Sequence, residues 1–347
     1  MTTHEFYMKR CIELAKNGLG TTYPNPLVGS VIVHDGKIIG EGWHKKAGEP
    51  HAEVNAVNSV KDKSLLKEAT IYVSLEPCSH FGKTPPCCDL IIANEIPNVV
   101  VGTVDPFAKV AGNGIKKLVE SGKNVTVGIL EDECNELNKR FFTFHQKKRP
   151  YIILKWAETA DGFIAPLSKE EKAPVWITNP YSRQLVHKWR TEEQAILVGT
   201  NTVLDDNPKL DARDFSGNNP IRIVLDKSGK ISENYQVKDN SQKTIFITES
   251  ENFISTENCI YENAIFDIHL ISSICDILYK NKIQSVIIEG GSKTLQSFID
   301  ANLWDEARVF IGQTTFQNGT IAPNISGNPV AGFDIMNDEL KIFKNYD

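Results

Sequence analysis

The alternation of short apolar segments with helical segments is the feature that most limits the fold of this chain. In residues 1–147 the pattern predicts a hairpin that turns at Asp35-Gly36, followed by alternating strands and helices that end in a closing helix over residues 132–145. Strands and helices in this order form a sheet covered by helices, because each element has an apolar face to bury. We therefore expect an α/β sandwich in the first half.

A polar segment at residues 146–150 (QKKRP) interrupts this pattern, and a second alternation of strands and helices follows it. At 347 residues the chain is long enough for two domains of ordinary size. We expect domains at residues 1–147 and 148–347, both of the α/β class. Residues 228–263 are polar and weakly periodic, which predicts surface loops, and the segment from Gln313 onward favours no particular structure.

The charge is divided unevenly between these halves. The formal net charge of −6 belongs to the second half, because residues 1–147 contain 17 basic and 17 acidic side chains. Neither half has the basic excess typical of proteins that bind a nucleic-acid backbone, so no nucleic-acid partner is expected. No run of about 18 apolar residues predicts a membrane span, and residues 1–14 favour an amphipathic helix over a signal peptide. The seven cysteines are an odd number, which is atypical of a disulfide framework and favours the cytoplasm.

His51, Glu53, Cys78 and Cys87 form the most informative pattern of the first half. One imidazole and two thiolates can hold Zn²⁺ and leave its fourth position to water, whose pKa then falls to about 7. Glu53 comes two residues after His51, near enough to move a proton without binding the metal. This order is the signature of zinc-dependent deaminases. We expect one zinc ion on His51, Cys78 and Cys87, and a catalytic Glu53.

The spacing of the cysteines departs from the general deaminase pattern, since eight residues separate them instead of two. Cys88 is a competing ligand, but Pro85-Pro86 rigidify the approach to Cys87, and the next helical position points elsewhere. One alternative is a closed structural zinc site, which needs a fourth ligand, and His80 is the nearby candidate. The other alternative is a set of buried thiols beside a surface histidine.

Longer segments around this pattern resemble the family of bifunctional riboflavin-biosynthesis deaminase–reductases. They are YPNPLVG at residues 23–29, GWH at 42–44, HAE at 51–53 and EPCSHFGKTPPC at 76–87. The last segment distinguishes this family from cytidine and tRNA adenosine deaminases. The resemblance implies a cytidine-deaminase-like α/β/α sandwich that hydrolyses the ring amino group of a diaminopyrimidinone carrying a ribosylamine phosphate. It also implies that the substrate is contacted by Asn25, His44, His80 and Lys83.

In the second half, no G-x-G-x-x-G motif follows a strand, which disfavours a Rossmann dinucleotide site. Residues 285–294 (SVIIEGGSKT) instead predict a strand that ends in two glycines, followed directly by a helix. The free backbone N–H groups of such a turn can receive a diphosphate. A tight strand–helix turn without a ligand is the alternative.

The resemblance continues through LKWA at residues 154–157, WIT at 176–178 and VGTNTVLDDNP at 198–208. It implies a dihydrofolate-reductase-like α/β domain that passes a hydride from NADPH to C1′ of the opened ribose. The implied NADPH contacts are Ala157, Trp176, Thr202, Asp206, Gly291, Ser292, Lys293 and Thr294. The implied contacts with the substrate are Arg190, Leu210, Arg213 and Glu289. The two arginines suit a phosphate because guanidinium groups bind it bidentately.

Three positions differ from the family pattern: Pro174-Val175 before WIT, Lys227 after Asp226, and the tail at residues 312–316. They bear on single reductase contacts and not on the fold. The leading hypothesis is a cytoplasmic, homo-oligomeric enzyme that uses zinc and NADPH on a small phosphorylated pyrimidine. The alternatives are a nucleoside or tRNA deaminase fused to an unrelated reductase, and a zinc-stabilised ligand sensor.

Overall fold

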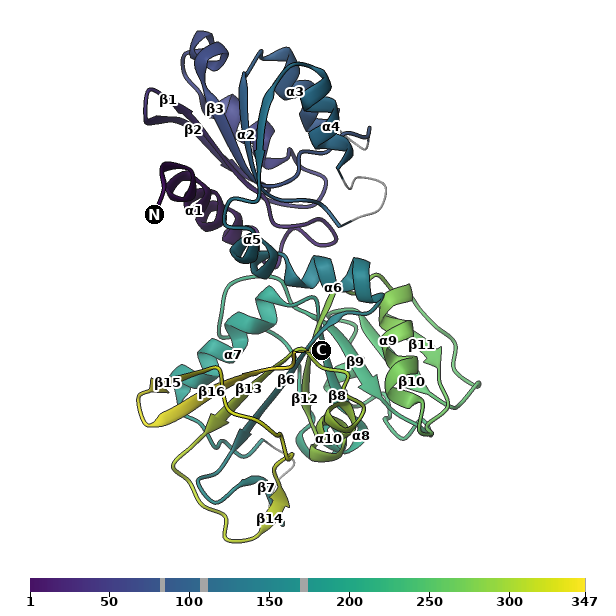
Figure 1. Cartoon of the computed structure of the whole chain (residues 1–347). Coiled ribbons are helices and arrows are strands. Elements are labelled where there is room, and N and C mark those ends of the chain that lie inside the picture. Colours follow the sequence, from purple (N-terminus) through teal and green to yellow (C-terminus); the bar gives the residue numbers. More distant parts are fainter. Residues whose placement is uncertain (82–84, 107–111, 169–173, 347) are drawn as a thin grey trace. The chain divides into compact units, whose positions relative to one another are not determined.

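The structure, a computed structural model, describes residues 1–81, 85–106, 112–168 and 174–346. The chain forms two compact units, Met1–Lys148 and Arg149–Asp347 (Figure 1). The division lies one residue from the boundary expected from the polar segment. Within the described ranges, no helix is both long enough and apolar enough to cross a membrane.

A five-stranded sheet forms the centre of the first unit, in the order β2-β1-β3-β4-β5. Its strands are β1 (Gly29–His34), β2 (Lys37–Trp43), β3 (Thr70–Leu75), β4 (Asn98–Thr103) and β5 (Asn124–Val127). β1 pairs antiparallel with β2 and β3, whereas β3, β4 and β5 run parallel. The hairpin turns at Asp35-Gly36 as predicted, and both residues have the positive φ that such a turn requires.

Helices cover both faces of this sheet, which makes the unit the expected α/β/α sandwich. α1 (Thr3–Lys16) and α5 (Glu131–Leu137) pack against Val31 and Tyr72 on one face. On the other face, Ile32 and Val73 contact the helices that follow β2, β3 and β4. These helices are α2 (Ala52–Ser59), α3 (Cys87–Ala93) and α4 (Asn113–Glu120), and a short 3-10 helix, Lys63–Glu68, precedes β3.

The closing helix expected over residues 132–145 is wrong in one respect, because the chain forms two helices there, α5 and α6 (Lys139–Lys147). They meet at Asn138, whose backbone leaves the helical region at φ −102° and ψ 17°. The Asn138 side chain is hydrogen-bonded to Leu27: Leu27 N donates to Oδ1 (2.8 Å) and Nδ2 donates to Leu27 O (2.9 Å). The break therefore depends on a contact between distant segments, which helical periodicity does not reveal.

A nine-stranded sheet forms the centre of the second unit, in the order β11-β10-β9-β8-β12-β6-β13-β16-β15. The strands from β11 to β13 in this order run parallel, and β16 and β15 add antiparallel pairs at one end. They are β6 (Tyr151–Glu158), β8 (Ala195–Gly199), β9 (Ile221–Leu225), β10 (Thr244–Thr248), β11 (Cys259–Asn263), β12 (Ser285–Gly290), β13 (Glu306–Ile311), β15 (Ala331–Ile335) and β16 (Asp338–Lys344).

Helices also cover both faces of this second sheet, so that the unit is of the expected α/β class. α9 (Leu270–Lys280) and α10 (Ser292–Asp300) pack on the face that carries Leu197 and Ile288. α7 (Pro180–Glu192) and α8 (Thr200–Asp206) pack on the face that carries Ile196 and Ile287. Neighbouring residues of one strand thus face opposite layers, as the pleat of a strand requires.

Several strands lie where the sequence favoured loops or no particular structure. The polar segment 228–263 contains a 3-10 helix, Gln236–Lys238, and ends in β11, which pairs with β10. The Tyr261 ring of β11 stacks between those of Phe246 and Phe253, at centroid distances of 5.3 and 4.6 Å. The tail forms β15, β16 and β14 (Gly319–Ile321), and β14 pairs with β7 (Phe163–Pro166). Pairing with strands from elsewhere in the chain stabilises these segments.

Candidate functional site

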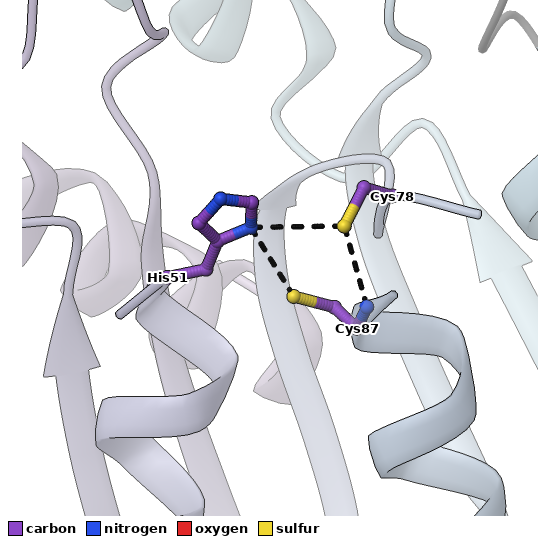
Figure 2. A group of neighbouring side chains, drawn as sticks. All are labelled: His51, Cys78 and Cys87. Carbon is purple, nitrogen blue, oxygen red and sulfur yellow. Dashed lines mark hydrogen bonds between the residues drawn. The ribbon is translucent and has the colours of Figure 1, made fainter. Parts of the chain in front are cut away.

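The three residues expected to bind zinc come from three different elements of the first unit. His51 is the N-cap residue of α2, Cys87 is the first residue of α3, and Cys78 follows β3 after a short connection. Figure 2 shows the imidazole and both sulfur atoms pointing toward one another. His51 Nδ1 lies 3.6 Å from Cys78 Sγ and 3.4 Å from Cys87 Sγ, and Cys87 N donates to Cys78 Sγ (3.3 Å).

This spacing fits a zinc ion. Tetrahedral Zn²⁺ with bonds of about 2.0–2.3 Å to nitrogen and sulfur places two such ligands about 3.5 Å apart. The possible ligand atoms of His51, Cys78 and Cys87 all lie within 4.8 Å of one another, and within the described residues no other histidine, cysteine or acidic residue joins the group. Three protein ligands leave one tetrahedral position for water, as in catalytic zinc sites.

Glu53 lies in the first turn of α2, beside this group, and its side chain is buried. Burial raises the pKa of the Glu53 carboxyl to about 7. A carboxyl group with this pKa can both accept and release a proton near neutral pH, which suits a general acid–base.

The other candidate ligands near the group have different surroundings. Cys88 Sγ donates to Pro77 O (3.2 Å) and to Gly114 O (3.5 Å), so the thiol of Cys88 is turned away from His51. His80, the candidate fourth ligand of a structural site, is exposed and does not belong to the group. Lys83, an expected substrate contact, lies outside the residues that the structure describes.

Glu76 has a position that the sequence analysis did not single out. Its buried carboxylate accepts hydrogen bonds from four backbone N–H groups, and it lies two residues before Cys78 in the chain. The donors are Asp105 N (3.2 Å), Gly112 N (2.9 Å), Gly114 N (2.8 Å) and Ile115 N (3.3 Å). Glu76 thus connects the start of α4 to the segment that carries Cys78. The sequence feature that could have indicated this position is the glutamate directly before Pro77-Cys78.

Asn25 and His44, both expected to contact the substrate, contact each other. Asn25 Nδ2 and His44 Nε2 are 3.0 Å apart, and His44 Nδ1 lies 3.2 Å from Pro50 O. The His44 ring lies edge-on to the His51 ring at a centroid distance of 5.4 Å, which places the pair beside the metal-binding group. Burial lowers the pKa of His44.

In the second unit, the expected cofactor turn lies where two neighbouring parallel strands end. β12 ends at Gly290 and α10 starts at Ser292, while the adjacent β8 ends at Gly199. A Cβ atom on Gly199 would come within 2.9 Å of Thr294 Oγ1, so the close approach of the two segments requires a glycine there. Ligands of parallel α/β sheets bind outside the carboxyl ends of the strands, as here.

The remaining expected cofactor contacts have varied surroundings. Thr202 Oγ1 lies 3.6 Å from where a Cβ on Gly291 would be, so Thr202 is at the same turn. Trp176 is half exposed, at 51%, and the Arg183 guanidinium lies 4.7 Å from its ring centroid. Ala157 is close to the carboxyl end of β6, and Asp206 is the last residue of α8. The Ser292 hydroxyl donates to Ile321 O (2.8 Å), and the Lys293 side chain is exposed.

Arg190 and Glu289, both expected to contact the substrate, form a bidentate ion pair with each other. Arg190 Nε donates to Glu289 Oε1 (3.0 Å) and Nη2 to Oε2 (2.7 Å), and Nη1 donates to Asp211 O (2.9 Å). Arg213 is bound to Asp211 through Nη1 (2.7 Å) and keeps an exposed side chain. The Leu210 side chain is buried in the core.

One face of α7 contacts the loop at residues 210–214, which carries two of the expected substrate contacts, Leu210 and Arg213. Arg183, His187 and Arg190 follow one another at helical spacing on this face. His187 Nε2 lies 3.3 Å from Asp214 Oδ2, and Arg183 Nε lies 3.4 Å from the same oxygen. Burial and the nearby Arg190 lower the pKa of His187 to about 4. His187 was not predicted as a site residue from the sequence, although the spacing of the basic residues could have indicated this face.

Comparison with known proteins finds a matching family for each half of the chain. Residues 1–103 match the family described as the cytidine and deoxycytidylate deaminase zinc-binding region, and residues 150–319 match the RibD C-terminal domain. The chain is 41% identical to the riboflavin biosynthesis protein RibD of Aquifex aeolicus, over 97% of this chain and 93% of that protein. It is 36% identical to RibD of Escherichia coli, over 94% and 90% of the two chains.

Solved structures also match this chain along nearly its whole length. A Thermotoga maritima diaminohydroxyphosphoribosylaminopyrimidine deaminase/5-amino-6-(5-phosphoribosylamino)uracil reductase is 40% identical, with a TM-score of 0.89 over 99% of this chain and 98% of that one. RibD of Acinetobacter baumannii is 31% identical, with a TM-score of 0.90 over 99% of both chains. The chain therefore belongs to the RibD family of bifunctional riboflavin biosynthesis proteins, in which a zinc-binding deaminase domain precedes a reductase domain.

Proposed function

We propose that His51, Cys78, Cys87 and Glu53 carry out the deaminase step on 2,5-diamino-6-ribosylamino-4(3H)-pyrimidinone 5′-phosphate. The observation that supports this assignment is the cluster of one imidazole and two thiols beside a buried carboxyl group. The step consumes one water, replaces the ring amino group by a carbonyl and releases ammonia. Family membership favours this function over a nucleoside or tRNA deaminase and over a zinc-stabilised sensor.

The deaminase residues have separate tasks. His51, Cys78 and Cys87 hold the zinc ion, and zinc, when bound, makes water nucleophilic at neutral pH. Glu53 takes a proton from the attacking water and delivers it to the departing amine. Burial raises the pKa of the Glu53 carboxyl and so favours the protonated form that gives its proton to the amine. Asn25 binds the pyrimidinone, and His80 and Lys83 lie on the phosphate side.

The second unit then reduces the product, 5-amino-6-(5-phosphoribosylamino)uracil. NADPH, when bound, supplies the hydride that, together with a proton from water, converts the opened ribosyl group into a ribityl chain. The cofactor is held at the carboxyl ends of β6, β8 and β12, by Ala157, Trp176, Thr202, Asp206 and the turn from Gly291 to Thr294. Arg190, Leu210, Arg213 and Glu289 lie at the substrate, and of these the two arginines bind its phosphate. In this arrangement Glu289 orients the Arg190 guanidinium, and Arg213 presents an exposed cation to the phosphate.

The order of the two steps is tested by mass spectrometry of the diaminopyrimidinone ribosylamine phosphate. The substrate is incubated with zinc-loaded protein, first alone and then with NADPH. We expect exchange of an amine for a carbonyl without NADPH, and a gain of two hydrogens after NADPH is added. Deamination without reduction would overturn the assignment of the second unit.

Glu53→Gln tests the acid–base role directly. The variant keeps the shape of the side chain but cannot accept the proton, so we expect kcat of deamination to fall by roughly 10²–10⁴-fold. Zinc content, measured by elemental analysis, and the far-UV circular dichroism spectrum stay unchanged. Turnover at the wild-type rate would contradict the role of Glu53, and loss of zinc would make the variant uninformative about proton transfer, in which case Glu53→Asp replaces it.

The proposal also includes self-association and a cytoplasmic location. Both are supported by the resemblance to the family, and the cytoplasm also by the unpaired cysteines within the described residues. Sedimentation velocity over a range of protein concentrations measures the assembly. A monomer at micromolar concentration would contradict it.

A further inference from the structure

His44 lies between a backbone carbonyl and the side chain of Asn25. Its Nδ1 is 3.2 Å from Pro50 O, and its Nε2 is 3.0 Å from Asn25 Nδ2. The side chain is 3% exposed, so both nitrogens depend on partners within the protein. Pro50 O also accepts a hydrogen bond from Asn55 Nδ2 (3.2 Å), and Asn55 Nδ2 donates to Trp43 O (2.8 Å) as well.

These partners determine which ring nitrogen of His44 carries hydrogen. A carbonyl oxygen only accepts hydrogen bonds, so Nδ1 must donate to Pro50 O. In a neutral imidazole the other nitrogen is then an acceptor. Nε2 therefore requires a donor, and the amide of Asn25 has a donor only at Nδ2.

The orientation of the Asn25 amide follows from this tautomer. With Nδ2 donating to His44, Oδ1 is at the opposite side of the amide and faces away from the imidazole. Within the described residues, Asn25 Oδ1 has no hydrogen-bond partner, and the Asn25 side chain is only partly buried. A ligand beside the metal-binding group thus meets the acceptor Oδ1 at Asn25, with the second N–H of Nδ2 next to it.

We infer that His44 is a positioning residue that holds the Asn25 amide with Oδ1 toward the substrate, so that Oδ1 accepts a hydrogen bond from an N–H group of the pyrimidine. This inference rests on the proposed deaminase function. It also changes the role expected for His44, because an imidazole with both nitrogens engaged inside the protein has no donor left for a phosphate.

A double-mutant cycle on the full-length, zinc-loaded protein tests whether His44 acts through Asn25. The variants are Asn25→Ala, His44→Ala and the double variant, and kcat/KM of deamination is measured with the diaminopyrimidinone ribosylamine phosphate. Loss of one hydrogen bond to the substrate predicts a decrease of roughly tenfold in Asn25→Ala. We expect His44→Ala to lose less than this, and the double variant to equal Asn25→Ala, because His44 has nothing left to orient.

Multiplied losses in the double variant would overturn the inference, because they would mean that His44 contacts the substrate independently. His34→Ala is the matched control: His34 is on β1 of the same unit and lies 3.5 Å from Glu68, away from Asn25. His34→Ala alone should leave kcat/KM at the wild-type value. Combined with Asn25→Ala, it should leave kcat/KM at the value of Asn25→Ala. If His44→Ala loses zinc or unfolds, His44→Gln replaces it in the cycle, and multiplied losses there overturn the inference equally.

The cycle separates this inference from the proposed function. Wild-type protein that does not deaminate the substrate would overturn both. Wild-type protein that deaminates it, with variants that retain zinc but act independently, would overturn only the positioning role of His44.

Discussion

Two buried carboxyl groups of this chain have pKa values shifted in opposite directions by their neighbours. Glu53 is buried beside His51 and the thiols of Cys78 and Cys87, and burial raises its pKa to about 7. Burial also raises the pKa of Glu289, but the adjacent Arg190 and Lys155 outweigh it and hold the pKa at about 2. The same residue type is therefore suited to proton transfer in one unit and to a permanent ion pair in the other.

The low pKa of Glu289 makes the stability of the second unit depend on pH. The pKa is about 2 in the folded protein against a model value of 4.5, so the unfolded chain binds more protons between these values. The ionised Glu289 carboxylate therefore stabilises the folded second unit by about 3 kcal/mol. This contribution is fully present above pH 4.5 and is lost as the pH falls toward 2. We expect Glu289→Gln to unfold more easily at pH 7 and to show a weaker acid dependence, by thermal unfolding at several pH values.

The control for this prediction is Glu339→Gln, because Glu339 pairs with Lys341 (3.3 Å) on β16 and both side chains are partly exposed to solvent. Exposed ion pairs contribute about 0–1 kcal/mol, so this variant should unfold like the wild type. An identical acid dependence in Glu289→Gln and wild type would contradict the pKa assigned to Glu289.

At the scale of elements, Glu76 joins β3 to the start of α4. Its carboxylate accepts four backbone N–H groups, so it replaces hydrogen bonds that the first turn of a helix lacks. A Cβ atom on Gly114 would come within 2.1 Å of Pro77 O, which shows how closely α4 approaches the Cys78 segment. The position of Cys78, a proposed zinc ligand, thus depends on α4, which contributes no residue to the cluster.

Glu76→Gln tests this connection. The amide removes the charge and one of the two accepting oxygens, so we expect the first unit to lose roughly 2–4 kcal/mol of stability. Zinc affinity, measured by competition with a chelator, should fall as well, because Cys78 is less well held. Glu120→Gln at the exposed end of α4 is the control and should change neither. Unchanged stability in Glu76→Gln would contradict the structural role of the carboxylate.

At the scale of the whole molecule, the division into two compact units predicts that the two activities can be separated. A chelator that removes zinc should abolish deamination, since the cluster of His51, Cys78 and Cys87 lies within the first unit. Reduction of separately supplied 5-amino-6-(5-phosphoribosylamino)uracil by NADPH should continue at the wild-type rate. Absorbance of NADPH at its long-wavelength band measures the second reaction, and a parallel loss of both activities would contradict independent units.

The sequence predicted the class of both units because hydrophobic periodicity is a local property of strands and helices. The sequence also predicted that His51, Cys78 and Cys87 come together, and the structure places their possible ligand atoms within 4.8 Å of one another. The break at Asn138 could not be predicted, because it depends on hydrogen bonds to Leu27, 111 residues away in the chain. β11 and the strands of the tail likewise depend on pairing with distant strands.

The sequence by itself determined the α/β class, the two-domain organisation and the residue types available for zinc and phosphate. The tertiary structure decided which of these residues contact one another: Arg190 with Glu289, Asn25 with His44, and Asp214 with His187. The physical reason is that periodicity and residue chemistry are encoded within short segments. Partners, tautomers and pKa values depend on the distance between groups that only the folded chain brings together.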